Sequence, residues 1–230
     1  MRDTHLIFVE GLPGSGKSTT ARYIADRLQQ AHMSTQLLAE VEPDHPLNVG
    51  GALHPAGDTT GADLFAQYTI EAYRAESLTR WTAFVSAAVR EASITVLDSY
   101  PYQNAARVLL QLDASPEVVR DYAREVEALT QSLTPVLVFI RRDSTPESFA
   151  ATTSARGEAW TAYAIEVMTN CPYARHRQLT GGDGALAMLA AYEALLEQLL
   201  HESRLPRIEL AGCQRDWQAC YERLDAFLSL

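Results

Sequence analysis

Lysine is almost missing from this chain of 230 residues. Of its 19 basic residues only Lys17 is a lysine, and all the others are arginine. The 29 acidic residues leave a formal net charge of −10. A surface this acidic repels nucleic acid and anionic membranes, so we expect neither as a partner. The segment that holds the one lysine is therefore informative, since a compact ammonium group on a long stem has specific uses.

Cysteine and long apolar runs are scarce as well. Cys171, Cys213 and Cys220 form neither a C-x-x-C pair nor a zinc spacing, and a small odd set is typical of packing roles in a reducing cytoplasm. No apolar run is long enough to span a bilayer, and no secretory signal is visible. We therefore expect a cytoplasmic protein. An apolar fraction of 47% without repeats predicts one domain over residues 1–230.

Lys17 belongs to a motif. Residues 11–18 read GLPGSGKS and match the phosphate-binding pattern G-x-x-x-x-G-K-[ST] at every required position. The apolar run 5–9 before it is typical of a buried strand, and apolar residues recur at helical spacing over 18–31. Free N–H groups and the helix dipole attract an anion at such a junction. This context argues against the alternative, a glycine-rich turn with a chance lysine.

The motif predicts a site for ATP or GTP with Mg²⁺. Its glycines let the backbone approach a phosphate closely. Lys17 can reach the β- and γ-phosphates, and the Ser18 hydroxyl can bind the metal. The predicted nucleotide-binding residues are Gly11, Pro13, Gly14, Ser15, Gly16, Lys17, Ser18 and Thr19.

Strands and helices alternate along the rest of the chain, which predicts a parallel sheet with right-handed crossovers. Further strands are expected at 35–41, 94–98, 135–140 and 207–210. Helices are expected at 62–92 (one long helix or two joined), up to about 112, and at 115–132, 145–157, 181–203 and 214–228. A long loop rich in Gly, Pro and Asp, residues 42–61, separates the second strand from the helix at 62–92.

Candidate functional residues follow the predicted strands. Asp98 ends the third strand, where P-loop enzymes hold Mg²⁺ through a carboxylate, although aspartate ends many strands. Glu40, Glu42 and Asp44 come at the end of the second strand, and ligands bind at this edge of open α/β sheets. For each of these three carboxylates a solvated acidic loop is the alternative. On the helix at 62–92, aromatic side chains either pack in the core or contact a substrate: Tyr68, Tyr73 and Trp81.

Residues 6–19 resemble the opening of the thymidylate kinase and deoxynucleoside kinase group of P-loop kinases. Three shorter segments support the resemblance: Asp98-Ser99-Tyr100 with Gln103 after the third strand, Glu42-Pro43 after the second, and Arg156-Gly157 where the arginine-bearing lid begins. The order of elements agrees over nearly the whole chain, but only residues 6–19 match tightly. The resemblance implies a three-layer α/β P-loop NTPase fold. It has a five-stranded parallel sheet in the order 2-3-1-4-5, acceptor-side helices at 62–92 and a mobile helical lid near 155–178.

The departures from these families are informative too. The families carry arginine where this chain has Ser99, and thymidylate kinase has arginine at the position of Val41 and an acid at that of Pro13. Those arginines would hold the acceptor's own phosphate. Their absence favours a hydroxyl acceptor over a nucleoside monophosphate, unless another arginine substitutes. The candidates for that substitution are Arg74, Arg107 and Arg141.

The sequence thus predicts a monomeric or homodimeric kinase that transfers the γ-phosphoryl group of ATP to a hydroxyl of a small molecule. The acceptor is a nucleoside-like compound or another hydroxylated metabolite or antibiotic. One alternative is a nucleoside monophosphate kinase. Others are a non-catalytic nucleotide-binding module and a P-loop regulator that hydrolyses nucleotide, although the chain lacks a guanine-reading Asn-Lys-x-Asp segment.

Each candidate has an expected role. Lys17 and Mg²⁺, the latter on Ser18 and Asp98, cover the phosphates. Arg156 closes from the lid, with Arg175 or Arg177, and stabilises the transition state while water is excluded. Glu42 takes the acceptor's proton, with Asp98 as second choice and then Glu40 and Asp44. The acceptor lies between loop 42–61 and the helix at 62–92, in contact with Tyr68, Trp81, Tyr100 and Gln103.

Overall fold

A parallel β-sheet forms the centre of the molecule. The structure is a computed structural model that describes residues 3–40, 42, 44–49, 65–142 and 144–230. Its five strands lie in the order β2-β3-β1-β4-β5, and all neighbours pair in parallel. Their bounds are β1 Leu6–Gly11, β2 Thr35–Leu38, β3 Ile94–Asp98, β4 Val136–Ile140 and β5 Arg207–Leu210. The predicted α/β class, strand number, direction and order are confirmed.

The central strands are apolar on both faces because both faces are covered. Every residue of β1 and β4 is buried, as expected for strands inside a parallel sheet. Val9 pairs with Asp98 across β1 and β3, and Gly11 pairs with Ile140 across β1 and β4. The carboxyl ends of the middle strands therefore meet at one edge, and the segments that follow them are brought together there.

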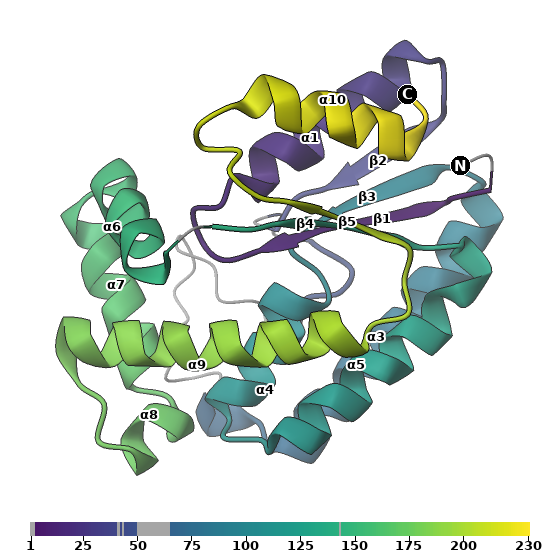
Figure 1. Cartoon of the computed structure of the whole chain (residues 1–230). Coiled ribbons are helices and arrows are strands. Elements are labelled where there is room, and N and C mark those ends of the chain that lie inside the picture. Colours follow the sequence, from purple (N-terminus) through teal and green to yellow (C-terminus); the bar gives the residue numbers. More distant parts are fainter. Residues whose placement is uncertain (1–2, 41, 43, 50–64, 143) are drawn as a thin grey trace.

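Helices cover both faces of the sheet (Figure 1). On one face lie α1 Lys17–Gln30 and α10 Trp217–Leu228. The other face carries α3 Ile70–Glu91, α4 Arg107–Gln111, α5 Pro116–Thr130 and α9 Gly181–Glu202. Two buried apolar clusters result, one under α1 and α10 and a larger one on the opposite face. The structure is thus three layers with a hydrophobic core on each side of the sheet.

Short helices stand beyond the carboxyl edge of the strands (Figure 1). They are α6 Thr145–Arg156, α7 Glu158–Thr169 and α8 Pro172–His176, which together cover most of the predicted lid at 155–178. Gly157 separates α6 from α7 with φ +83°, a left-handed conformation that glycine adopts without strain. A π-helix, Tyr102–Ala106, leads from β3 into α4, and a 3-10 helix, Gln131–Leu133, follows α5.

Some boundaries differ from the predicted ones. β2 ends at Leu38 rather than at residue 41, so Glu40 follows it closely. Within the expected helix at 62–92, residues 65–67 are helical, and α3 then starts anew at Ile70 because the Thr69 hydroxyl accepts a hydrogen bond from the Ala72 amide, 3.2 Å away. Residues 41, 43 and 50–64, which include Val41, Pro43 and most of the predicted long loop, lie outside the described residues.

The cysteines differ from expectation. Cys213 and Cys220 form a disulfide with a Cα–Cα distance of 5.7 Å, so the prediction of simple packing roles is wrong for this pair. The disulfide joins the middle of the loop after β5 to the first turn of α10, which the sequence pattern did not reveal. Cys171 is a free, buried thiol. Among the described helices, none is both long and apolar enough to cross a membrane.

Candidate functional site

A cavity of about 460 Å³ lies at the carboxyl edge of the sheet. One wall is the glycine-rich loop, defined here as residues 11–18, together with the start of α1. The other walls come from Glu40 and residues 47–49, from Tyr73 of α3, from the segment 98–108, and from α6 and α7. Residues from very different parts of the chain therefore face a common space.

At two positions of the glycine-rich loop, Gly14 and Gly16, the backbone suits only glycine. Gly14 and Gly16 have φ values of +77° and +102°. A Cβ atom added to Gly16 would lie 2.4 Å from the Trp217 ring, and one added to Gly14 would lie 2.1 Å from the Thr152 hydroxyl. No side chain caps the N-terminus of α1, so the first N–H groups of this helix remain available to an anion.

Four consecutive carbonyl groups of the glycine-rich loop accept hydrogen bonds from side chains. The donors to four consecutive carbonyl oxygens are Lys17 Nζ for Leu12 (3.0 Å), Ser148 Oγ for Pro13 (2.5 Å), Arg142 Nη2 for Gly14 (2.7 Å) and Gln214 Nε2 for Ser15 (3.3 Å). Oxygens held in this way do not oppose an anion, whereas the amide N–H groups attract one. The loop is thus organised to bind negative charge.

Lys17, Ser18 and Asp98 come together at the base of the cavity. Lys17 is 5% exposed, and burial lowers its pKa while the carboxylates of Glu40, Asp98 and Glu10 act in the opposite direction. Burial raises the pKa of Asp98. The charge of Lys17 and hydrogen bonds from the hydroxyls of Ser18 and Ser99 act in the opposite direction. The three predicted residues therefore form one charged group, and an oxygen-rich pair, Ser18 and Asp98, suits a hard divalent cation.

Ser99 fixes the geometry directly after β3. Its φ of +75° is unusual for a residue other than glycine. The Ser99 amide donates to Val9 O (3.0 Å), and its hydroxyl donates to Asp98 Oδ1 (2.9 Å). Strained backbone of this kind persists where the surroundings hold it, often at functional sites. Here it orients the Asp98 carboxylate toward Lys17.

Glu10 is a buried carboxylate that the sequence reasoning used only for family resemblance. It is fully buried in β1, and its two oxygens accept hydrogen bonds from the backbone N–H groups of Tyr102 (2.7 Å) and Gln103 (3.1 Å). Burial raises its pKa, while these two donors and Lys17 oppose the shift. The available signal was an acid inside an apolar strand, because buried charges are retained only with partners. Glu10 anchors the segment that carries Gln103.

The opposite end of the cavity is lined by Gln103 and its neighbours. Gln103 Nε2 donates to Glu40 Oε1 (3.1 Å), and its backbone oxygen accepts from Arg107 Nε (2.9 Å). Among the buried polar atoms that lack a hydrogen-bond partner within the described structure, Gln103 Oε1 and the Tyr163 hydroxyl belong to residues that line this cavity. Buried polar atoms are rarely left unpaired, so these two favour a ligand with hydrogen-bonding groups. Apolar lining comes from Leu47, Val49, Tyr73, Val108, Ala164 and Val167.

Tyr100 and Gln103, both predicted to contact the acceptor, line this cavity. The Tyr100 ring stacks on His45 with centroids 4.3 Å apart, and its hydroxyl hydrogen-bonds Asn48 Oδ1. Burial lowers the pKa of His45 to about 4, so the ring is neutral at pH 7. The segment 45–49 is thus docked against Tyr100.

Glu42, Tyr68 and Trp81 are not brought to the cavity. Glu42 Oε1 accepts the Ala39 amide (3.1 Å), so this carboxylate caps its own turn. The Tyr68 hydroxyl donates to Glu76 (2.8 Å). Trp81 is 1% exposed in the core below the sheet, where its ring nitrogen donates to the Tyr122 hydroxyl (3.0 Å). The predicted roles of Glu42 as base and of Tyr68 and Trp81 as substrate contacts are therefore not supported.

Glu40 occupies the place expected for Glu42. Of the three acids near the end of β2, only Glu40 lines the cavity, and Asp44 lies outside it. Because β2 ends at Leu38, the chain has turned away by residue 42. The sequence placed both acids at the correct edge of the sheet but ranked Glu42 above Glu40.

The predicted arginines separate in the same way. Arg156 lines the cavity, with its guanidinium 4.9 Å from the centre of the Trp160 ring. Arg177 pairs with Asp113 on the outer surface, and Arg175 also lies outside the cavity. Among the possible substitutes for the missing family arginines, Arg74 pairs with Glu125 and Arg141 pairs with Glu197 and Glu209. Arg107 alone of these three lines the cavity.

No family model matches the chain, and no curated protein matches it as a relative. The function must therefore be argued from the residues of the site.

Proposed function

We propose that this protein is a P-loop kinase that transfers the γ-phosphoryl group of ATP or GTP to a hydroxyl of a small molecule. The observation that carries the proposal is the convergence of the glycine-rich loop, Lys17, Ser18, Asp98 and Glu40 on one cavity at the carboxyl edge of a parallel sheet. Ligands bind at this edge of open α/β sheets. Phosphoryl transfer depends mainly on positioning and charge neutralisation, which this group of residues can supply.

The triphosphate would bind the N–H groups of the glycine-rich loop and of the first turn of α1. Lys17 would contact the β- and γ-phosphate oxygens. Before nucleotide binds, the hydrogen bond from Lys17 Nζ to Leu12 O holds the side chain in place. Ser18 and Asp98 would hold Mg²⁺, directly or through water. Bound there, Mg²⁺ would neutralise the charge that develops on the phosphates.

Glu40 is the best-placed general base. Glu40 lines the cavity, and its side chain is oriented by the Gln103 amide. It lies close enough to Lys17 for its charge to act to raise the pKa of Lys17. In the proposed step the acceptor oxygen attacks the γ-phosphorus, Glu40 receives the hydroxyl proton, and the nucleoside diphosphate leaves. Asp98 is the second candidate, but its role at the metal would compete with that of a base.

Arg156 would stabilise the transferring group from the opposite side. Its stacking on Trp160 keeps the guanidinium at the cavity wall. The α6–α7 wall would also exclude water, which would otherwise hydrolyse the nucleotide.

A nucleoside monophosphate acceptor is the second candidate, and Arg107 favours it. Arg107 lines the acceptor end and forms no ion pair with any described carboxylate. A guanidinium can bind a phosphate with two parallel hydrogen bonds. Arg107 could therefore hold the acceptor's own phosphate in place of the arginines missing at positions 41 and 99.

The test is nucleoside diphosphate formation from Mg-ATP and Mg-GTP with matched acceptors. The panel pairs nucleosides with their monophosphates and adds sugars and hydroxylated antibiotics, and mass spectrometry checks for a product heavier by one phosphoryl group. We expect turnover only when an acceptor is present. Slow hydrolysis that no acceptor accelerates would support the regulator alternative, and absence of ATP and GTP binding would overturn the proposal.

A further inference from the structure

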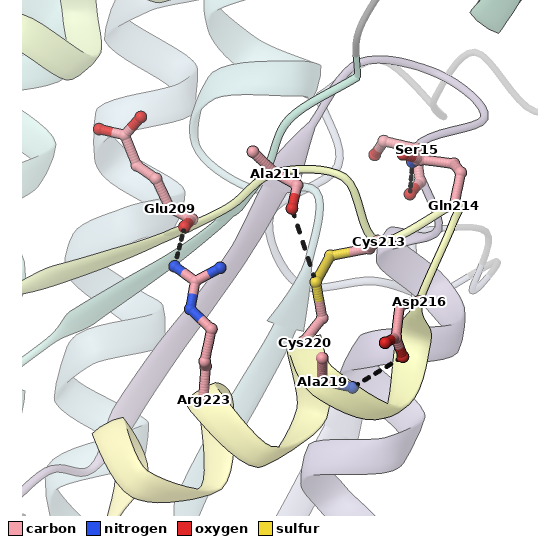
Figure 2. Close-up of a disulfide and its surroundings, with 9 residues drawn as sticks. All are labelled: Ser15, Glu209, Ala211, Cys213, Gln214, Asp216, Ala219, Cys220 and Arg223. Atoms are coloured by element: carbon pink, nitrogen blue, oxygen red, sulfur yellow. Dashed lines mark hydrogen bonds between the residues drawn. A yellow bond between two sulfur atoms is a disulfide. The ribbon is translucent and has the colours of Figure 1, made fainter.

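The disulfide closes a short segment beside the glycine-rich loop. Cys213 and Cys220, which are seven positions apart, bracket the end of the loop after β5 and the first turn of α10 (Figure 2). Both cysteines are at most 3% exposed. We call residues 213–220 the bridged segment. None of the roles proposed above for nucleotide or acceptor involves it directly.

The bridged segment contacts two neighbouring residues of the glycine-rich loop. Gln214 Nε2 donates to the Ser15 carbonyl oxygen at 3.3 Å (Figure 2). The Trp217 ring lies against Gly16 so closely that even a methyl group there would collide with it. Both contact residues, Gln214 and Trp217, lie between the two cysteines, so the covalent bond restrains the residues that make the contacts.

Further contacts define the conformation of the bridged segment at the start of α10. The Asp216 side chain caps α10 by accepting the Ala219 amide (3.0 Å), as Figure 2 shows. Trp217 packs on Tyr221, which stacks on Tyr23 of α1 at a centroid distance of 4.0 Å. The segment is therefore attached to the same helix that begins at the glycine-rich loop. A shift of Trp217 would alter the surroundings of Gly16.

We propose that the bridged segment positions the glycine-rich loop for nucleotide binding, with Gln214 and Trp217 as the positioning residues and the disulfide as their restraint. This inference rests on the proposed nucleotide site. Glycines at 14 and 16 give the free loop many conformations, and fixing them costs conformational entropy. A loop already held at Ser15 and Gly16 avoids part of that cost when a triphosphate binds.

The first test is Gln214→Ala, with Gln218→Ala as its matched control. Gln218 lies in the same bridged segment, but its amide donates to the exposed Glu222, and no hydrogen bond joins it to the glycine-rich loop in the described structure. Loss of one hydrogen bond predicts a dissociation constant for Mg-ATP that is roughly 3- to 10-fold higher in Gln214→Ala, with no change in Gln218→Ala. Calorimetry measures affinity and stoichiometry separately. A merely structural role would lower the melting temperature and the stoichiometry while leaving the dissociation constant unchanged.

The second test removes the disulfide by Cys213→Ser and Cys220→Ser together, alone and combined with Gln214→Ala. If the disulfide acts through Gln214, the combined protein should bind Mg-ATP about as weakly as the weaker of its two parents. Multiplying effects would show that the disulfide does not act through Gln214 and would overturn that step. If the serine protein does not fold, Gln214→Ala still decides the positioning role.

The two proposals fail in distinguishable ways. A wild-type protein that binds neither Mg-ATP nor Mg-GTP contradicts the proposed function. If the wild type binds nucleotide, but Gln214→Ala and Trp217→Phe bind it just as tightly, only the positioning role is contradicted.

Discussion

The two ends of the cavity are built in different ways. The proposed nucleotide end is built from the backbone of eight consecutive residues, in a conformation that their glycines allow. Four side chains donate hydrogen bonds to four of the carbonyl oxygens of this loop. At the acceptor end, single side chains arrive from separate segments: Glu40 after β2, Gln103 from the π-helix, Arg107 from α4 and Tyr163 from α7. The backbone of the first end comes from neighbouring residues, whereas the side chains of the second come together only once the chain has folded.

This difference has a functional consequence. Backbone groups bind any nucleoside triphosphate, since they contact the phosphates that all of them share. Side chains drawn from several segments can change one at a time without disturbing the loop. In the proposed enzyme, the first end binds the nucleotide, and the second end supplies the general base and determines acceptor specificity. Substitutions at both ends test this division.

The largest effect is expected from Glu40→Gln. This change keeps size and hydrogen bonding but removes the proposed base, so kcat should fall roughly 10²- to 10⁴-fold with ATP affinity intact. Glu42→Gln is the matched control, because Glu42 caps its own turn outside the cavity. Steady-state rates of both variants with one acceptor decide the matter. A large loss in Glu42→Gln with none in Glu40→Gln would reverse the assignment.

Lys17→Ala should lower kcat by roughly 10²- to 10³-fold, since it removes a preorganised donor from the transferring phosphate. Lys17→Arg tests whether charge alone suffices, and we expect it to fail because the planar guanidinium differs in shape from an ammonium. Product formation at saturating ATP measures both. Normal turnover in Lys17→Ala would contradict the assignment of the nucleotide to this end of the cavity.

Arg107→Met should act at the acceptor end alone. If the acceptor carries an anionic group, its KM should rise roughly 10- to 100-fold, the range for a hydrogen bond to a charged partner, while ATP affinity stays the same. Arg74→Met is the control, because Arg74 pairs with Glu125 outside the cavity. An unchanged KM would favour an uncharged, hydroxylated acceptor.

The smallest effect concerns pH and His45. Burial lowers the pKa of His45 to about 4, whereas the unfolded chain takes up the proton near its ordinary value of 6.5. The stability that neutral His45 contributes is therefore present above pH 6.5 and is lost as pH falls toward 4. Melting temperatures of the wild type and His45→Gln should converge over that interval. Curves that stay parallel would contradict a buried, neutral His45.

The sequence predicted the sheet and the glycine-rich loop because both are encoded by neighbouring residues. Continuous apolar runs mark β1 and β4, and the spacing of Gly11, Gly16 and Lys17 contains the loop geometry itself. Trp81 shows the limit of such patterns: an apolar stripe on a helix does not tell which members face the core and which face a cavity. Glu40 and Glu42 differ by only two positions, and their roles depend on where β2 ends. The pairing of Cys213 with Cys220 likewise depends on how the loop after β5 turns.

Helix α6 links the glycine-rich loop to the wall opposite it. Its Ser148 holds Pro13 O, its Thr152 packs on Gly14, and its last residue is Arg156. Arg156 therefore belongs mechanically to the nucleotide end, although the sequence assigned it to a moving lid. If the wall opens to admit an acceptor, we expect the hinge at Gly157, where no atom lies near the space a side chain would fill. Amide hydrogen exchange should then be faster in α7 than in α6. Helix α7 would move about Gly157 without displacing Arg156.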